Sequence, residues 1–130
     1  MKLAIICMTL LFTIGMDTNA QDNAKPPSTY TRIAKLVIDS AQLEGYKAIL
    51  KEEMEASVRV EPGVLALRAV YDIKNPTFVT LLEIYADKDA YNLHVKSPHF
   101  IKYKTSTAAM VKSLELIDVV PIALAAKPGW

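Results

Sequence analysis

The sequence predicts a single domain of the α+β class with its elements in the order β-α-β-β-α-β. Two observations lead to this prediction. Strand-like segments rich in β-branched residues flank two segments of helical periodicity, and the middle pair of strands is joined by a turn too short for a crossover. The length of 130 residues suits one domain. This order of elements is the ferredoxin-like, or split βαβ, arrangement.

A change in apolar period predicts the first strand and the first helix. Residues 32–39 alternate and are rich in Ile, Leu and Val, which indicates a strand. Ser40 can cap a helix whose apolar residues are spaced three and four apart, so this side should pack on a sheet. The apolar residues of this helix are Leu43, Tyr46, Leu50, Met54 and Val58.

The middle of the chain predicts an antiparallel hairpin. Glu61-Pro62-Gly63 breaks the first helix, and residues 64–72 have the composition of a second strand. The turn Lys74-Asn75-Pro76 leads directly into a third strand over residues 77–85. So short a connection joins antiparallel strands.

The second half predicts an interrupted helical region and a last strand. Asp87 caps the region, and Ser97-Pro98 restarts it, because an N-cap hydroxyl precedes a proline at the first helical position. This helix is predicted to run to about Val111. Residues 114–123 read as the fourth strand, and Pro121 predicts that its far end lies on an edge of the sheet.

The N-terminus is predicted to be a secretory signal peptide. Lys2 supplies a positive charge, residues 3–15 form a nearly unbroken apolar run, and Ala20 ends a cleavage site. The run is shorter than the roughly 20 residues that a spanning helix needs, which favours cleavage over an anchor. We therefore predict an exported protein, periplasmic or secreted, with no membrane association after cleavage. The predicted segments are residues 1–20 (signal peptide), 21–30 (linker), 31–126 (domain) and 127–130 (tail).

Composition excludes several classes of function. A net charge of +1 gives no basic face for nucleic acid. The only cysteine, Cys7, lies in the signal segment, so the mature chain has no thiol nucleophile and no thiolate metal site. No glycine-rich phosphate loop and no serine elbow are present, which argues against a nucleotide cofactor and a serine hydrolase.

The predicted strands carry apolar residues at both alternating positions, although two helices cover only one face of a four-stranded sheet. A large apolar patch is rarely left in water, so the second face should meet another subunit or enclose a cavity. The mature chain of about 110 residues is also small for a self-sufficient core. These arguments predict a homodimer whose sheets face each other.

The two histidines of the chain, His94 and His99, lie on either side of Ser97-Pro98. The positive field at the helix start should keep His99 neutral and able to accept a proton, whereas His94, near the end of the preceding turn, should favour the cation. Alternatively, His99 only hydrogen-bonds a backbone carbonyl between the helices. Their spacing does not align both rings on one helical face and no third ligand is evident, so no metal site is predicted.

Further candidates for the site lie on the strands and the last helix. Glu83 and Tyr85 share one strand face and could reach the same space. For Glu83, a salt bridge with Arg68 across the hairpin is favoured over catalysis. The secondary candidates are Tyr71, Glu83, Tyr85, Phe100 and Tyr103; the tyrosines are more often core rings, and Phe100 and Tyr103 should pack on the sheet.

Together these motifs resemble the antibiotic biosynthesis monooxygenase domain, and within it the small quinol-monooxygenase-like proteins. The resemblance rests on Glu61-Pro62-Gly63, on Glu83-Ile84-Tyr85 of the hairpin, and on the segment from His94 to Phe100. It covers residues 32–122 and implies a dimeric α+β barrel. Tyr85 stands where the family often has tryptophan, and the secretory signal is atypical of the family.

The resemblance implies an oxygenase that uses no flavin, haem or metal and oxidises phenols, quinols or polyketide aromatics with O2. We therefore expect a cofactor-independent monooxygenase acting on a quinol-like or phenolic aromatic, with His94 and His99 as the catalytic residues and the secondary candidates around the substrate. The alternatives are a non-catalytic dimeric barrel that holds a small molecule or haem, and an interaction module whose cavity is filled by side chains.

Overall fold

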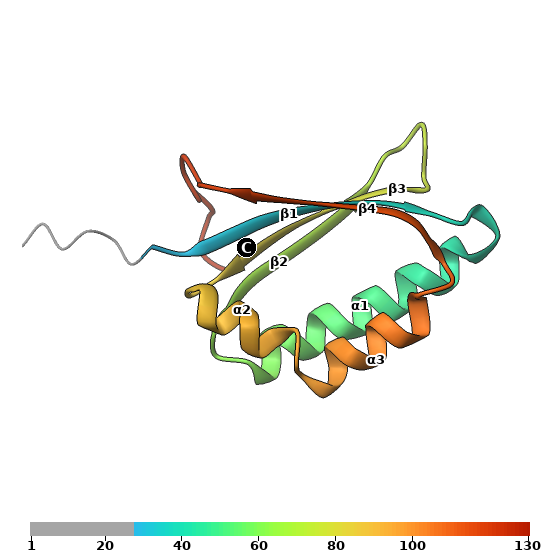
Figure 1. Cartoon of the computed structure of the whole chain (residues 1–130). Coiled ribbons are helices and arrows are strands. Elements are labelled where there is room, and N and C mark those ends of the chain that lie inside the picture. The colour runs from blue at the N-terminus through green and yellow to red at the C-terminus, as the bar shows by residue number, and fades with distance from the viewer. Residues whose placement is uncertain (1–27) are drawn as a thin grey trace, which may run out of the picture.

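The computed structural model describes residues 28–130, which form a four-stranded antiparallel sheet with its helices on one face (Figure 1). The predicted signal peptide and most of the predicted linker lie outside the described residues. The α+β prediction and the ferredoxin-like order are confirmed. The elements are β1 (Tyr30–Ile38), the short 3-10 helix η1 (Ser40–Gln42), α1 (Leu43–Val60), β2 (Val64–Tyr71), β3 (Phe78–Tyr85), α2 (Lys88–His94), α3 (Pro98–Thr107) and β4 (Val111–Val119).

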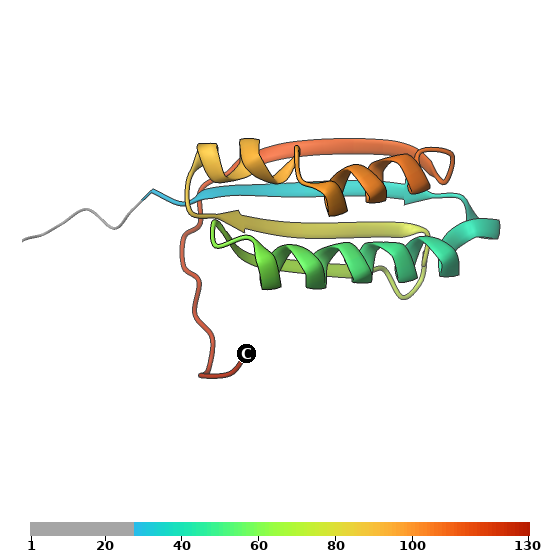
Figure 2. The same cartoon turned by 90° about the horizontal axis from the view of Figure 1, so that it is seen from below.

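The sheet has the strand order β2-β3-β1-β4, with α1 over β2 and β3 and with α2 and α3 over β1 and β4 (Figure 2). The central strand β1 pairs antiparallel with β3 and β4, so that Arg32 lies opposite both Glu83 and Asp118. Residues opposite each other in antiparallel strands project to the same face. The register therefore builds continuous rows of side chains under the helices.

The predicted cap at Ser40 was wrong: Ser40 lies within η1, where the Asp39 carboxylate accepts a hydrogen bond from the Ala41 amide at 2.9 Å, and α1 begins at Leu43. The buried stripe of α1 also differs from the predicted one. Its buried residues are Tyr46, Leu50, Glu53 and Ser57, whereas Val58 is 48% exposed. The predicted apolar stripe of α1 is therefore wrong in its last turn, where it reaches solvent-exposed positions. The true stripe carries a glutamate and a serine to the interior, and both belong to the site described below.

The capping side chains form the predicted helix starts. The Asp87 carboxylate accepts a hydrogen bond from the Ala90 amide at 2.7 Å, and the Ser97 hydroxyl accepts one from the Phe100 amide at 3.3 Å. Pro98 occupies the first turn of α3. Because each cap fixes where its helix begins, the histidines at the end of α2 and the start of α3 are brought close together.

Four predicted boundaries were wrong. Helix α3 ends at Thr107 rather than near Val111, because β1 recruits Val111 into the sheet opposite Ile38. Strand β4 consequently begins earlier than residue 114 and ends at Val119, before Pro121, which has no amide hydrogen to donate. Strand β1 begins at Tyr30 and so includes the last residue of the predicted linker.

A buried hydrogen bond joins the two long helices. The hydroxyls of Tyr46 on α1 and Tyr103 on α3 lie 2.8 Å apart, and both side chains are buried. Ala34, Leu36 and Leu81 of the sheet complete the core beneath them. A polar contact inside the core fixes the distance between the helices, which apolar packing alone would leave adjustable.

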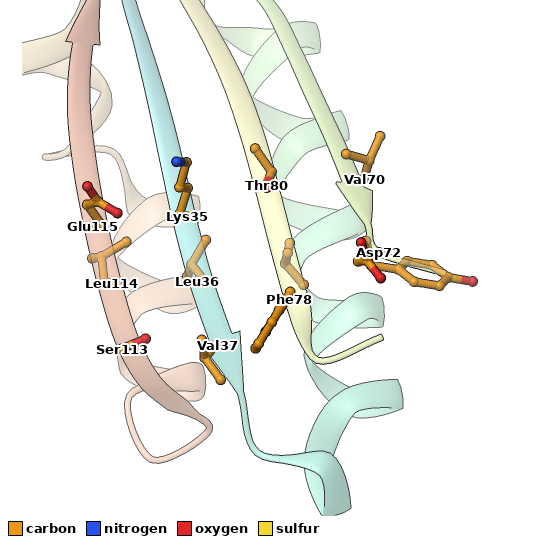
Figure 3. Close-up of a pocket in the computed structure, with 12 residues that line it drawn as sticks. Lys35, Leu36, Val37, Val70, Asp72, Phe78, Thr80, Ser113, Leu114 and Glu115 are labelled. Carbon is orange, nitrogen blue, oxygen red and sulfur yellow. The ribbon is translucent and has the colours of Figure 1, made fainter. Parts of the chain in front are cut away.

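The face of the sheet away from the helices is only partly apolar. It holds a hollow of about 670 Å³ at the end where β1, β3 and β4 lie side by side (Figure 3). Phe78 and Val37 contribute apolar surface there, and Lys35 and Glu115 contribute charge. The homodimer remains a prediction. Among the residues described, no helix has the length and apolar character needed to cross a membrane.

Gly63 is predicted to be essential for the packing of α2 against the turn after α1. A Cβ at Gly63 would lie 2.5 Å from the Ala90 Cβ, whereas a Cβ at Gly45 would meet nothing within 4 Å. We expect Gly63→Ala to lower the free energy of unfolding by about 1–3 kcal/mol, as measured by urea denaturation.

Gly45→Ala is the matched control, and it should be neutral or stabilise α1 by up to about 1 kcal/mol. Adding Ala90→Gly to Gly63→Ala should restore part of the lost stability. Equal effects of the two glycine substitutions would show that the approach of Ala90 does not limit the packing.

Candidate functional site

The site is organised by Glu61, which lies in the turn between α1 and β2. Its amide donates to the Ser57 carbonyl at 3.0 Å, and its carbonyl accepts from the Val64 amide at 3.1 Å. Pro62 ends the helix, and Gly63 allows the close approach of Ala90 on α2. The turn therefore presents the Glu61 side chain to the junction between α2 and α3.

One oxygen of Glu61 binds both histidines. Glu61 Oε2 lies 2.9 Å from His94 Nδ1 and 2.6 Å from His99 Nε2. The His94 side chain is 4% exposed, and those of Glu61 and His99 are 16% and 19% exposed. The alternative prediction, that His99 bonds only a backbone carbonyl, was therefore wrong.

The shared carboxylate determines which nitrogen of each ring carries a hydrogen. Burial opposes ionisation of Glu61, but the hydrogen bonds from His94 and His99 outweigh it and hold the pKa of Glu61 below its ordinary value. An ionised carboxylate can only accept hydrogen bonds. His94 therefore donates through Nδ1, and its Nε2 carries the lone pair when the ring is neutral.

Glu53 faces the other side of the His94 ring. Its Oε1 lies 3.6 Å from His94 Nε2 and accepts a hydrogen bond from the Ser57 hydroxyl at 2.6 Å. In the described part of the chain, His94 Nε2 has no hydrogen-bond partner. The His94 nitrogen that does not bond Glu61 thus lies beside a buried carboxyl group.

Three side chains at this junction could hold a metal ion. One ligand atom each from Glu53, His94 and His99 lie within 4.8 Å of one another. Two histidines and a carboxylate suit zinc or iron. A metal at this position would compete with Glu61, which already accepts hydrogen bonds from both rings. The sequence revealed no third ligand because Glu53 comes from a distant part of the chain.

A cavity of about 660 Å³ lies between the sheet and the helices, next to His94. The ring of His94 packs edge-on against Phe100, with centroids 4.8 Å apart, and its centroid lies 5.4 Å from that of Tyr85. Glu53, Tyr103 and several leucines also line the cavity. It has the size and the mostly apolar lining of a small-molecule site.

Glu83 and Tyr85 contribute polar groups to the cavity from β3. The Tyr85 hydroxyl donates to Glu83 Oε2 at 3.1 Å. Burial raises the pKa of Tyr85, as does the neighbouring Glu83 carboxylate, so this phenol stays protonated. Burial also raises the pKa of Glu83, against the opposing effects of the Tyr85 hydrogen bond and the charges of His94 and Arg32. Glu83 is thereby brought closer to carrying a proton itself.

The predicted salt bridge between Glu83 and Arg68 was wrong. Arg68 pairs with Leu82, so its side chain projects to the opposite face from Glu83. The partner across the sheet is Arg32, which lies opposite Glu83 on β1. The predicted pairing of Arg68 with Glu83 and the observed pairing of Arg68 with Leu82 differ by one residue in strand register. The sequence alone does not determine this register.

Arg32 holds a network of hydroxyl groups at the same end of the cavity. Its guanidinium donates to the Tyr91 hydroxyl at 2.6 Å, to the Tyr30 hydroxyl at 2.7 Å and to Asp118 at 2.9 Å. Arg32 and Tyr91 both line the cavity. The cation is therefore fixed in place, where it can stabilise negative charge on a bound molecule.

The structure brings together five of the seven predicted site residues around one cavity. These are Glu83, Tyr85, His94, Phe100 and Tyr103. His99 lies behind His94, against Glu61 and a small cavity of about 40 Å³. Tyr71 lies elsewhere: it is 50% exposed at the end of β2, and the Lys47 ammonium stands 4.6 Å from its ring centroid.

Sequence reasoning missed Glu53, Arg32 and Tyr91 as site residues, and it treated Glu61 only as part of a turn. A signal for Glu53 was present, because it lies three residues after Leu50 and four before Ser57 on the buried stripe of α1. A charged residue on a buried stripe needs a partner, which marks a candidate site. No comparable signal pointed to Arg32.

The fold and site define a ferredoxin-like α+β protein with a carboxylate–histidine pair beside a largely apolar cavity. The family model for antibiotic biosynthesis monooxygenase matches residues 29–106, which is more than half of the chain. The chain therefore belongs to the antibiotic biosynthesis monooxygenase family. A search of curated proteins finds no match.

Solved structures agree with this assignment. A Bacteroides thetaiotaomicron protein with the provisional name antibiotic biosynthesis monooxygenase is 50% identical, with a TM-score of 0.74 over 77% of this chain and 95% of its own. A Lactobacillus acidophilus protein, provisionally a monooxygenase, is 33% identical, with a TM-score of 0.71 over 72% of this chain and 45% of its own. A Mycobacterium tuberculosis protein, 19% identical with a TM-score of 0.67 over 76% of this chain and all of its own, shares the fold. The family and the first two neighbours support a monooxygenase-like function.

Replacing the shared carboxylate tests its structural role. We expect Glu61→Gln to lower the free energy of unfolding by about 1.5–3 kcal/mol at neutral pH, because it removes a charged acceptor of two hydrogen bonds. The folded pKa of Glu61 is lowered, so its contribution is complete above the ordinary value of 4.5 and is lost as the pH falls through the folded value. The stability difference from wild type should therefore shrink on acidification, as measured by denaturation at several pH values.

Glu52→Gln is the matched control on α1. The Glu52 side chain is 68% exposed and pairs with Lys102 at 2.9 Å, so its replacement should change stability by less than about 1 kcal/mol. A difference between Glu61→Gln and wild type that persisted below the folded pKa of Glu61 would contradict the assigned role.

Proposed function

We propose that this protein is a cofactor-independent monooxygenase that oxidises a phenolic or quinol-like aromatic with O2. One observation carries the proposal: Glu61 holds His94 through Nδ1, and His94, whose Nε2 lies 3.6 Å from Glu53 Oε1, lines a largely apolar cavity. This arrangement suits a general base that removes a proton from a bound phenol.

Glu61 would act on the base in two ways. Its hydrogen bond keeps the lone pair of neutral His94 on Nε2, and its negative charge stabilises the imidazolium that forms after proton transfer. His99 donates to the same oxygen at 2.6 Å and so holds Glu61 in position. This proposal exchanges the roles expected from the sequence, in which His99 was the proton acceptor: His99 is then a positioning residue, and His94 is the catalytic residue.

The reaction needs no reductant besides the substrate. The phenolic proton passes to His94 Nε2, and the electron-rich ring adds O2 at the carbon para to the hydroxyl. His94 returns the proton to the outer peroxide oxygen. Loss of the ring hydrogen as a proton and cleavage of the O–O bond then give a quinone and water. Overall, one phenol and one O2 give one quinone and one water.

The remaining polar groups would stabilise charge or supply protons. Arg32, fixed by Tyr91 and Asp118, can stabilise the phenolate or the peroxide anion. Glu83, whose pKa burial raises, can donate a proton to the departing oxygen. The apolar lining around them would lower the local polarity and so strengthen these electrostatic interactions.

The first test is oxygen uptake by the purified protein with reduced quinols and hydroxynaphthalenes, after subtraction of buffer autoxidation. We expect uptake above this background, and we expect His94→Gln to lower kcat/KM by about 10²–10⁴-fold, the usual contribution of a general base. His99→Gln should have a smaller effect, with a changed pH profile because Glu61 loses one donor. Unchanged uptake in a folded His94→Gln variant would contradict the assignment of the base.

Chelation distinguishes this proposal from metal-dependent oxidation at Glu53, His94 and His99. Protein treated with a strong chelator and then desalted should consume O2 at the same rate as untreated protein. Loss of activity that ferrous ion restored would overturn the cofactor-independent proposal, because those three side chains could hold such an ion.

A further inference from the structure

The cavity beside His94 is polar at one end and apolar along the rest of its length. The pairing register of the sheet sets this order. β1 runs along the sheet side of the cavity, and every second residue of β1 points toward the helices. From the polar to the apolar end, the lining rows are Arg32 with Glu83, then Ala34 with Leu81 and Leu116, and then Leu36 with Leu114. At a rise of about 3.3 Å per residue, these rows span roughly 13 Å.

The helices above the sheet follow the same order. Tyr91, His94 and Glu53 lie at the polar end, and α3 carries Phe100 and then Thr107 along the slot. The Thr107 hydroxyl already donates to the Tyr103 carbonyl at 2.8 Å, so it offers no free donor to a ligand. His94, Glu53 and Glu83 are therefore all at the polar end.

The apolar end of the slot opens at β4, which is an edge strand. Leu114 and Leu116 point toward the helices, yet they are 44% and 48% exposed. Lys104 and Lys112 flank this opening, and neither forms an ion pair with a described residue. Their aliphatic stems extend the apolar strip while their ammonium groups reach water.

We infer that the substrate is a phenol carrying a long, uncharged apolar chain, of the alkyl or prenyl class. The ring would lie at the polar end against His94, and the chain would lie over Leu36, Leu114 and Leu116 and leave between β4 and α3. The identity of the head group rests on the proposed function, whereas the chain is argued from the lining alone. A compact aromatic would leave most of the 660 Å³ cavity unfilled.

The test is equilibrium binding of 4-alkylphenols with methyl, butyl, octyl and dodecyl chains, measured by calorimetry in the absence of O2. Their para carbon is blocked, so binding is separated from turnover. We expect affinity to rise by up to about fourfold for each methylene that becomes buried. The increase should stop once the chain passes the opening at β4.

Leu116→Asp should abolish this dependence on chain length, whereas Leu65→Asp should leave both the dependence and the affinity for 4-methylphenol within about twofold. Leu65→Asp is the matched control, because Leu65 is similarly exposed at 49% on the other edge strand and lies outside the cavity. Affinity that is flat from methyl to octyl, or an unchanged dependence in Leu116→Asp, would overturn the inference.

Two further results separate this inference from its alternatives. Phenols with the alkyl chain at carbon 3 keep a free para carbon and can be oxidised by the proposed reaction. If they are not oxidised but their binding rises with chain length, the apolar slot is supported and the oxygenase proposal fails. If they are oxidised and neither rate nor binding depends on chain length, the oxygenase proposal stands and the inference about the chain fails. If Leu116→Asp lowers the molar mass measured by light scattering, Leu116 belongs to a contact between two copies. That result would overturn the assignment of the opening to a substrate chain.

Discussion

The structure depends on one carboxylate oxygen that two histidines share. Glu61 ties the turn after α1 to the end of α2 and the start of α3, and these three segments have no other charged contact with each other among the described residues. A buried negative charge is tolerated only where hydrogen bonds replace water, and His94 and His99 provide them. The break between α2 and α3, set by the Ser97 cap and Pro98, allows this contact, because one continuous helix would separate two rings five residues apart.

The sheet makes the rest of the site through its register. Because β1 lies between β3 and β4, each β1 residue that points toward the helices has a paired residue on both neighbouring strands. These sets of paired residues follow one another along the cavity as successive rows. Arg32 gives the polar row, and Ala34 and Leu36 give the apolar rows. A shift of one residue would turn every one of these side chains to the other face. The chemistry at His94 and the shape of the slot therefore rest on the same hydrogen-bonded pairing.

The fold could be predicted because its signals are local, whereas the site depends on distant pairs. The caps Asp87 and Ser97 and the Lys74-Asn75-Pro76 turn each fix a boundary within a few residues. The end of α3 could not be predicted, since β1 determines where β4 begins. Glu83 was paired with Arg68 because the sequence does not reveal a strand register, and Glu61 was treated as a turn residue because its partners lie more than thirty positions away.

His99 gives Glu61 an anchor that His94 alone could not provide. If Glu61 were bonded to His94 only, each proton taken up by His94 would change the balance of charge that holds the carboxylate in its turn. His99 approaches the same oxygen from α3 at a shorter distance, so Glu61 remains anchored whichever form His94 adopts. In the proposed reaction His94 gains and loses a proton in every cycle, and such a base needs an orienting group that does not move. Glu61 and His99 meet this need, and the same two residues also join the turn after α1 to the start of α3.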